Sequence, residues 1–366
     1  MKVGILTHYG VNNQGAQLQM YALNQQLKDL GYTPVILTYN KNFDFERSQK
    51  LRNEISIHSI PYILKNFLLK KGFRLTFHNM KKYLINKRFR ENNFCFEFYS
   101  DSDCNAVVIG SDQVFDVDVG INIMMFGFGL NTKNLITYAP CFGKTDPSSL
   151  ASKNLDNLVK SGLEKISHVS VRDRHSQKVL KELCERTVPI VCDPALLYTF
   201  TKELEMVKIK PISKKYLIAY SYDRRFIDKN EVTAIKKFAK RNNLITVSVG
   251  TYHKWCDKNI ACDCLDWIAY FKNAECIITD TFHGTIASII GQKPFAVIVR
   301  QNGNKMLDLL RVTSSEERLL NDLTIEELNR VFSKAMCWDK INQSVKEIRT
   351  FSLNFLQGAL EDMENS

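Results

Sequence analysis

Short apolar runs alternate with helix-like patterns along most of this 366-residue chain. Apolar runs bounded by turn-forming residues are typical of buried strands, whereas apolar residues recurring every three or four positions indicate helices. In the first half, the runs predict strands at residues 3–7, 34–39, 106–110, 135–139, 168–171 and 189–192. The periodic segments predict helices at residues 14–30, 148–164 and 176–184. This alternation is typical of a parallel sheet covered by helices.

The same alternation starts again after a charged link at residues 198–213. It predicts strands at residues 216–220, 244–249, 276–279 and 294–299, with helices at residues 228–241, 264–273, 285–290 and 338–362. The last helix is long enough to cross back onto the first half. A chain of this length exceeds one typical core. We therefore predict an α/β fold with two Rossmann-like domains, residues 1–205 and 206–366, facing a cleft.

A basic segment interrupts the first domain at residues 46–92. It holds twelve lysines and arginines against three glutamates, a net charge of +9 within a total of +11. Apolar and aromatic residues interleave with these charges, which predicts an amphipathic helical insertion. Such a surface suits anionic lipid headgroups or a phosphorylated substrate, although a pair of solvated helices would give the same pattern. No nucleic-acid-binding motif accompanies it, so we expect no nucleic acid partner.

Three other features of the sequence bear on the class of protein: its apolar runs, its first residues and the spacing of its cysteines. No apolar run approaches the length of a membrane helix, and residues 1–6 suggest a strand instead of a signal peptide. The ten cysteines are scattered, and the only close pair, Cys262 and Cys264, lacks zinc or redox spacing. We therefore expect a globular cytoplasmic protein without a metal site.

The turn after the predicted strand 276–279 is the most informative part of the chain. It carries Asp280, Thr281, His283 and Gly284 within five residues. Ligands of open α/β sheets bind at the carboxyl ends of strands, and a histidine there can exchange a proton near neutral pH. A capping turn around a packed imidazole is the structural alternative.

Other strand ends carry further candidates. The turn at residues 8–16 includes Asn13, Gln14 and Gly15, whose backbone N–H groups could face an anion at a helix N-terminus. Ser111 and Asp112 follow Gly110 after another buried strand, and Asp112 could bind a sugar hydroxyl. A polar loop with a helix cap is the structural alternative for the first turn, and capping alone would explain the second turn equally well.

Two more turns close the first domain. Arg172 ends a strand and suits a bidentate contact with a carboxylate or phosphate, although a surface pair with Asp173 is an alternative. Asp193 precedes Pro194 in a turn that we expect to be structural.

The order of these turns resembles the polysaccharide pyruvyl transferase family. The matching pieces, between Gly4 and about Leu320, are Asn13-Gln-Gly15-Ala16, Gly110-Ser-Asp-Gln-Val114, Ile136-Thr-Tyr-Ala139 with Phe142-Gly143, Ser170-Val-Arg-Asp173, Asp193-Pro194, and Thr279-Asp-Thr-Phe-His-Gly284 with Lys293-Pro-Phe295. Each piece is short, but six in the same order are specific.

The resemblance implies a GT-B-like fold and transfer of a pyruvyl group from phosphoenolpyruvate to a sugar, which forms a cyclic ketal. It implies that His283 is the general acid or a phosphate ligand and that Arg172 binds the donor. Some members carry arginine two residues before the motif histidine, where this chain has Thr281; Arg300 is the candidate to replace that charge. No cofactor is implied, and a lipid-linked acceptor would fit the basic segment at the inner membrane face.

Three other functions remain open at this stage. A GT-B-type glycosyltransferase using a nucleotide sugar would share the fold, with Asp280 or His283 as base. A non-catalytic assembly protein of a polysaccharide machine would need neither residue. Nucleic-acid binding through residues 46–92 would be strongly salt-dependent.

Overall fold

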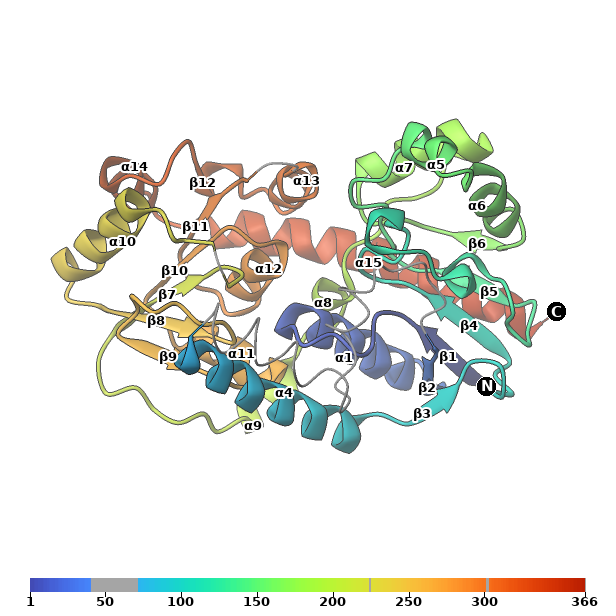
Figure 1. The fold of residues 1–366 in the computed structure, drawn as a ribbon, viewed down its shortest axis with the longest axis horizontal. Coiled ribbons are helices and arrows are strands. Elements are labelled where there is room, and N and C mark those ends of the chain that lie inside the picture. Colours follow the sequence, from blue (N-terminus) through green and yellow to red (C-terminus); the bar gives the residue numbers. More distant parts are fainter. Residues whose placement is uncertain (41–71, 224, 301–302, 366) are drawn as a thin grey trace.

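The structure, a computed structural model, describes residues 1–40, 72–223, 225–300 and 303–365. Within these ranges the chain forms two six-stranded sheets that lie side by side in Figure 1. The first sheet contains β1 (Lys2–Leu6), β2 (Thr33–Thr38), β3 (Phe96–Phe98), β4 (Ala106–Ile109), β5 (Leu135–Thr137) and β6 (His168–Val169). The second contains β7 (Tyr216–Tyr220), β8 (Ile245–Val249), β9 (Lys258–Ile260), β10 (Cys276–Thr279), β11 (Phe295–Ile298) and β12 (Leu319–Leu320).

Helices cover both faces of each sheet. Those of the first half are α1 (Gln14–Asp29), α4 (Phe73–Asn93), α5 (Pro147–Ser152), α6 (Asp156–Leu163), α7 (Arg174–Cys184), α8 (Pro194–Leu197) and α9 (Thr201–Met206). Those of the second half are α10 (Lys229–Arg241), α11 (Cys264–Lys272), α12 (Phe282–Ile290), α13 (Asn304–Val312), α14 (Ile325–Phe332) and α15 (Trp338–Glu364). Three 3-10 turns complete the described elements: η3 (Val117–Val119), η4 (Ile123–Phe126) and η5 (Glu316–Arg318). Among the helices described, none is both long and apolar enough to cross a membrane.

Both sheets have the same strand order. The first runs β3-β2-β1-β4-β5-β6 and the second β9-β8-β7-β10-β11-β12, with every neighbouring pair parallel. In the first sheet, β1 to β3 follow one another toward one edge and β4 to β6 toward the other, so the chain changes direction across the sheet between β1 and β4. The second sheet has the same change of direction between β7 and β10. A crevice opens at such a reversal, because the connections leave toward opposite faces. The predicted pair of Rossmann-like units is confirmed, and each unit has one such crevice.

Three apolar clusters hold the sheets together. One lies on the face of the first sheet covered by α5, α6 and α7, and another on the face of the second sheet covered by α10 and α14. The largest is shared by both halves and includes residues of α1, α8, α11, α12 and α15. Helix α1 is buried on nearly all sides as a result, including Gln17, Gln19 and Asn24. The two halves therefore share one continuous core.

The final helix, α15, links the halves directly. It starts beside the second sheet and ends beside the first, near the N-terminus (Figure 1). Ser352 in its middle accepts a hydrogen bond from the Cys192 backbone at 2.8 Å, and His168 lies 3.6 Å from Asp362 near its end. Leu356 and Leu360 are fully buried on its inner face.

Several predicted elements differ from the structure. The helix at residues 148–164 is two helices, because Asn154 adopts a left-handed φ of 55° between α5 and α6. Residues 189–192 form only an isolated bridge between Val171 and Ile190 in place of a strand, since Pro189 has no N–H to donate. Helix α12 begins at Phe282, so His283 lies in its first turn and not in a preceding loop. Strands β3, β9 and β12 were not predicted, because two or three residues are too few to establish a pattern.

The predicted basic insertion is described only in part. Residues 46–71 lie outside the described ranges, and residues 73–93 form α4. Its apolar side chains are divided between two faces: Phe89 is buried, whereas Phe77 and Leu84 are exposed.

Candidate active site

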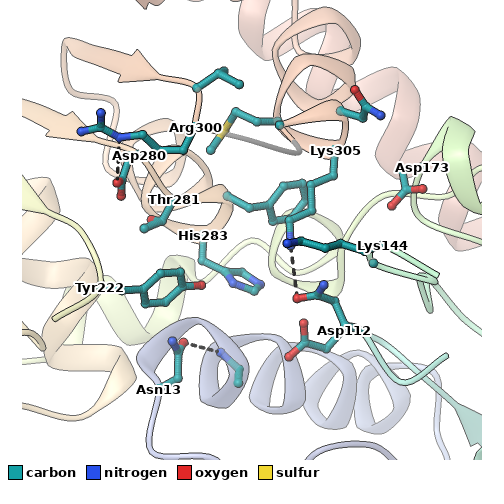
Figure 2. A pocket seen from close by; sticks show the side chains of 18 of the residues that line it. Asn13, Asp112, Lys144, Asp173, Tyr222, Asp280, Thr281, His283, Arg300 and Lys305 are labelled. Atoms are coloured by element: carbon teal, nitrogen blue, oxygen red, sulfur yellow. Dashed lines mark hydrogen bonds and ion pairs between the residues drawn. The ribbon is translucent and has the colours of Figure 1, made fainter. Parts of the chain in front are cut away.

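A cavity of about 490 Å³ lies between the two sheets, and we call it the cleft. Its walls come from the loops that follow the strands at the two reversal points (Figure 2). Asn13 follows β1, Asp112 follows β4, Tyr222 follows β7 and His283 follows β10. The two crevices thus face each other across one shared cavity, as in ligand sites of paired α/β sheets.

Four helices begin at this cleft. The side chains of Asn13, Thr281 and Asp173 cap α1, α12 and α7 by accepting hydrogen bonds from backbone N–H groups of the first turn, and α13 begins at Asn304. All four residues line the cavity. The N-terminal end of a helix carries a partial positive charge, so this convergence favours an anion in the cleft.

His283 is held at the junction of the two halves. Its Nε2 lies 3.5 Å from Asp193 Oδ2, and only 7% of the residue is exposed. The other side of the ring packs on Gly15, where an added Cβ would lie 2.4 Å from His283 Nδ1. Glycine at this position is therefore required for α1 to approach the imidazole.

Asp193 links His283 to Arg172. Arg172 donates a hydrogen bond from NH1 to Asp193 Oδ2 at 2.8 Å, and its guanidinium lies over the Phe282 ring at 4.6 Å. Burial alone would raise the pKa of Asp193, but the neighbouring His283, together with Arg172, holds it at about 2. Burial alone would lower the pKa of Arg172, but the contact with Cys141 and the neighbouring carboxylates, Asp193 first among them, raise it. Asp193 is therefore an ionised partner that orients the histidine.

Arg172 lies behind the cleft wall. Its side chain is 2% exposed and lines a separate apolar cavity of about 210 Å³ instead of the cleft. Asp112, 3.8 Å from Arg172 NH2, does line the cleft. Although burial opposes ionisation of Asp112, Arg172 and His283 lower its pKa. Asp112 thus presents a carboxylate to a ligand, while Arg172 supports it from the rear.

Asp280 and Arg300 form a second charged group on the wall of the cleft. Arg300 donates two hydrogen bonds to Glu231, at 2.6 and 2.8 Å, and one to Asp280 at 3.4 Å. Arg225 also lies 3.7 Å from Asp280. Burial raises the pKa of Asp280 despite these cations. The charge of Arg300 is thus already neutralised by the protein, which makes it a weak substitute for the arginine absent at Thr281.

Two lysines that the sequence reasoning missed point into the cleft. Lys144 and Lys305 come from opposite halves of the chain, and both line the cleft (Figure 2). Lys305 donates a hydrogen bond to the Gln113 side chain at 3.4 Å, and no ion pair is recorded for either lysine within the described residues. Two ammonium groups on the wall of one cavity favour an anion inside it. Both follow strand ends, after β5 and β11, and a systematic reading of every strand end would have found them.

Four other predicted site residues lie outside the cavity lining. Gln14 donates a hydrogen bond to the Cys262 carbonyl at 3.0 Å and so joins the two halves. Ser111 is buried and accepts from Thr7 through its carbonyl. At Gly284 an added Cβ would lie 2.3 Å from Thr279 Oγ1, which explains the glycine. With Gly15, they position the cleft and do not line it. In the described part of the chain, no three His, Cys, Asp or Glu residues cluster as metal ligands.

Comparison with known protein families shows the family to which the chain belongs. The model of the family described as polysaccharide pyruvyl transferase matches residues 13–302. This range includes every cleft residue discussed except Asn304 and Lys305. No match was found among the curated proteins.

Solved structures show the same fold. The chain is similar to a putative UDP-N-acetylglucosamine 2-epimerase from Listeria monocytogenes, with 10% identity, a TM-score of 0.51, and 98% of this chain and 95% of that chain covered. It is also similar to the glycotransferase of kitacinnamycin (9% identity, TM-score 0.52, coverage 99% and 98%) and to Arabidopsis thaliana UGT89C1 complexed with UDP-L-rhamnose (8%, 0.51, 98% and 98%). At these identities the likeness concerns the fold alone, and it confirms the predicted GT-B-like architecture.

Proposed function

Because the chain belongs to the polysaccharide pyruvyl transferase family, we propose that it transfers a pyruvyl group from phosphoenolpyruvate to a sugar and forms a cyclic ketal. The acceptor is a sugar of a bacterial surface polysaccharide or of its lipid-linked precursor. The protein acts in the cytoplasm, where phosphoenolpyruvate is made.

The observation that supports this donor is the charge arrangement around His283. Phosphoenolpyruvate carries a carboxylate and a phosphate close together. Four helix N-termini and the side chains of Lys144 and Lys305 converge on the cleft beside the histidine, and such groups stabilise two adjacent anionic groups. We assign the donor phosphate to the two lysines and the donor carboxylate to the N-terminus of α12.

The proposed reaction needs one acid and one base at the cleft. Protonated His283 donates its proton to the methylene carbon of phosphoenolpyruvate, which leaves an oxocarbenium-like centre at the neighbouring carbon. A sugar hydroxyl attacks this centre and gives its proton to Asp112. The carbon–oxygen bond to phosphate then breaks, and phosphate leaves with the electron pair and takes up the proton held by Asp112. The second hydroxyl closes the ketal. The proton of that hydroxyl returns to His283, so the enzyme ends as it began.

Asp193 and Arg172 act through the histidine in this scheme. Asp193 faces His283 Nε2, and Arg172 holds Asp193 in place. Neither needs to touch the donor, which departs from the donor-binding role that the resemblance implies for Arg172. Asp280 lies beside Arg225 and Arg300 on the wall of the cleft, and we assign it a structural role there.

Phosphate release in the presence of acceptor tests the proposal. The purified protein is incubated with phosphoenolpyruvate and a panel of lipid-linked or aryl galactosides and N-acetylhexosamines. We expect acceptor-dependent phosphate release, a pyruvyl mass increment on one sugar, and loss of both in His283→Ala. His168→Ala is the control, because His168 is partly exposed and lies outside the cleft, beside Asp362.

A thermal-shift comparison separates the proposal from a nucleotide-sugar transferase. Phosphoenolpyruvate is expected to raise the unfolding temperature, whereas UDP- and GDP-sugars are not. A shift with nucleotide sugars alone, together with their consumption, would assign the cleft to glycosyl transfer instead.

A further inference from the structure

Helix α4 has an unusual distribution of side chains. Three polar residues, His78, Lys82 and Asn86, are buried on its inner face. Four large apolar residues are exposed on its outer face: Phe73 (73%), Phe77 (57%), Met80 (55%) and Leu84 (58%). We call these four residues the α4 stripe. A surface helix normally has the reverse arrangement, so the stripe needs an explanation.

The polar inner face is explained by contacts with both halves of the protein. Asn86 donates to Asn12 at 2.6 Å in the loop after β1. Lys82 donates to the Gly250 carbonyl at 3.0 Å, and Asn79 donates to Asp223 at 3.0 Å in the loop after β7. Helix α4 is thus held by side-chain hydrogen bonds to both halves. It runs along their lower edge in Figure 1. These contacts leave the outer stripe without a partner in the described structure.

The stripe has the geometry of a helix that lies on a membrane. Spacings of four, three and four residues place its members within roughly 60° of one another around the helix. Exposed basic residues flank it on both sides, with Lys87 on one side and Arg74, Lys81 and Arg88 on the other. Glu91 is the one acidic residue of α4. Apolar insertion flanked by lysine and arginine is the pattern that anionic lipid surfaces bind.

We propose that the outer face of α4 binds the surface of an anionic phospholipid bilayer. The stripe enters the boundary between headgroups and acyl chains, and the flanking cations contact lipid phosphates. This surface does not depend on the reaction proposed above. It does place the cleft near the bilayer, because the α4 contacts Asn12 and Asp223 adjoin the cleft residues Asn13 and Tyr222. A lipid-linked substrate could then reach the cleft without leaving the membrane.

Vesicle flotation with the full chain tests the proposal. Vesicles of phosphatidylcholine alone are compared with vesicles that also contain phosphatidylglycerol. We expect binding only to the anionic vesicles, weakened by added salt. The double substitution Phe77→Ser with Leu84→Ser should weaken binding by at least about tenfold. Lys81→Glu with Arg88→Glu should weaken it by a similar factor at low salt.

Met206→Ser with Ile227→Ser is the matched control, because both residues are at least 70% exposed and lie outside α4. Its binding should equal that of the parent protein. Unchanged circular dichroism and melting temperature confirm that each variant is folded. The proposal is overturned if the parent protein does not bind anionic vesicles, or if the α4 variants bind them as well as the control does. It is also overturned if light scattering shows a dimer that Phe77→Ser with Leu84→Ser dissociates, since a second copy would then cover the stripe.

Discussion

At the residue scale, three side chains from separate segments form one line that leads from the cleft into the protein: His283, Asp193 and Arg172. The first belongs to the second half of the chain and the other two to the first half. The histidine can keep its orientation only while the halves stay together. This dependence makes Asp193 a positioning residue whose effect on chemistry can be separated from its effect on stability.

Asp193→Asn is expected to lower kcat of pyruvyl transfer by about 10²-fold or more, because the amide cannot stabilise the protonated imidazole. KM for phosphoenolpyruvate should change little, since Asp193 does not line the cleft. The free energy of unfolding should fall by about 3 kcal/mol, as Arg172 loses its closest carboxylate. Steady-state kinetics and urea titration measure the two effects. A raised KM with unchanged kcat would contradict the positioning role.

Lys305→Met is expected to raise KM for phosphoenolpyruvate about tenfold or more by removing a charge-assisted hydrogen bond to the phosphate. Steady-state kinetics with varied donor concentration measures the change. Lys178→Met is the control, because Lys178 lies on the exposed side of α7 and outside the cleft. Equal KM values for both variants would remove Lys305 from the donor site.

At the element scale, the approach of α1 to α12 depends on Gly15. An added Cβ would lie 2.3 Å from His283 Cγ, a distance that nonbonded atoms do not tolerate. Gly15→Ala should therefore displace the imidazole and lower kcat/KM by about 10²-fold. Enzyme assays and thermal melting of the variant test this expectation.

Gly358→Ala in α15 is the matched control for Gly15→Ala, since no atom lies within 4 Å of its added Cβ. Activity should be unchanged and the free energy of unfolding should rise by about 0.5–1 kcal/mol. If Gly15→Ala retained full activity, the close approach would have no role in positioning His283.

The attachment of α4 should weaken in acid. Burial, followed by the charge of Lys82, lowers the pKa of His78 from 6.5 to about 4. Between these values the unfolded chain binds a proton that the folded protein excludes, so stability falls as pH drops from 6.5 toward 4. His78 should account for a loss of about 3 kcal/mol in the free energy of unfolding over this pH range. Comparing urea titrations of the parent protein and His78→Gln across this range isolates it.

His168→Gln serves as the control for His78→Gln, because His168 is partly exposed and lies outside α4. The parent protein and His168→Gln should lose stability alike on acidification, and His78→Gln should lose less. Parallel curves for all three proteins would show that His78 is not the group responsible.

At the scale of the whole molecule, the shared core makes one cooperative unit of two sheets. Leu356→Ala in α15 removes a fully buried side chain of that core and should lower the free energy of unfolding by about 2–5 kcal/mol. Tryptophan fluorescence reports the second half alone, because Trp255, Trp267 and Trp338 all follow residue 206. Circular dichroism reports the whole chain, so the two probes should shift together.

Phe351→Ala, also in α15 but half exposed, should change stability by less than about 1 kcal/mol. Separate fluorescence and dichroism transitions in the parent protein would mean that the halves unfold independently. In that case Leu356→Ala should affect only one of them.

The sequence by itself determined the elements and the family. Apolar runs predicted the long strands correctly, because a strand buried on both faces must be apolar throughout. The turns after β1, β4 and β10 were found because ligand-binding chemistry gathers at the carboxyl ends of parallel strands. Asn13, Asp112, Thr281 and His283 were recognised in this way, and all four line the cleft.

Only the tertiary structure decided which of these groups meet. Asp193 was expected to be structural, yet its carboxylate faces His283 across 90 residues of chain. Arg172 lies behind that carboxylate and not in the cleft, and Lys144 and Lys305 converge from opposite halves. Local patterns report which face of an element is apolar, since burial acts on each residue separately. They do not report how two sheets pack together, and that packing determines which charged groups lie within a few ångströms of one another.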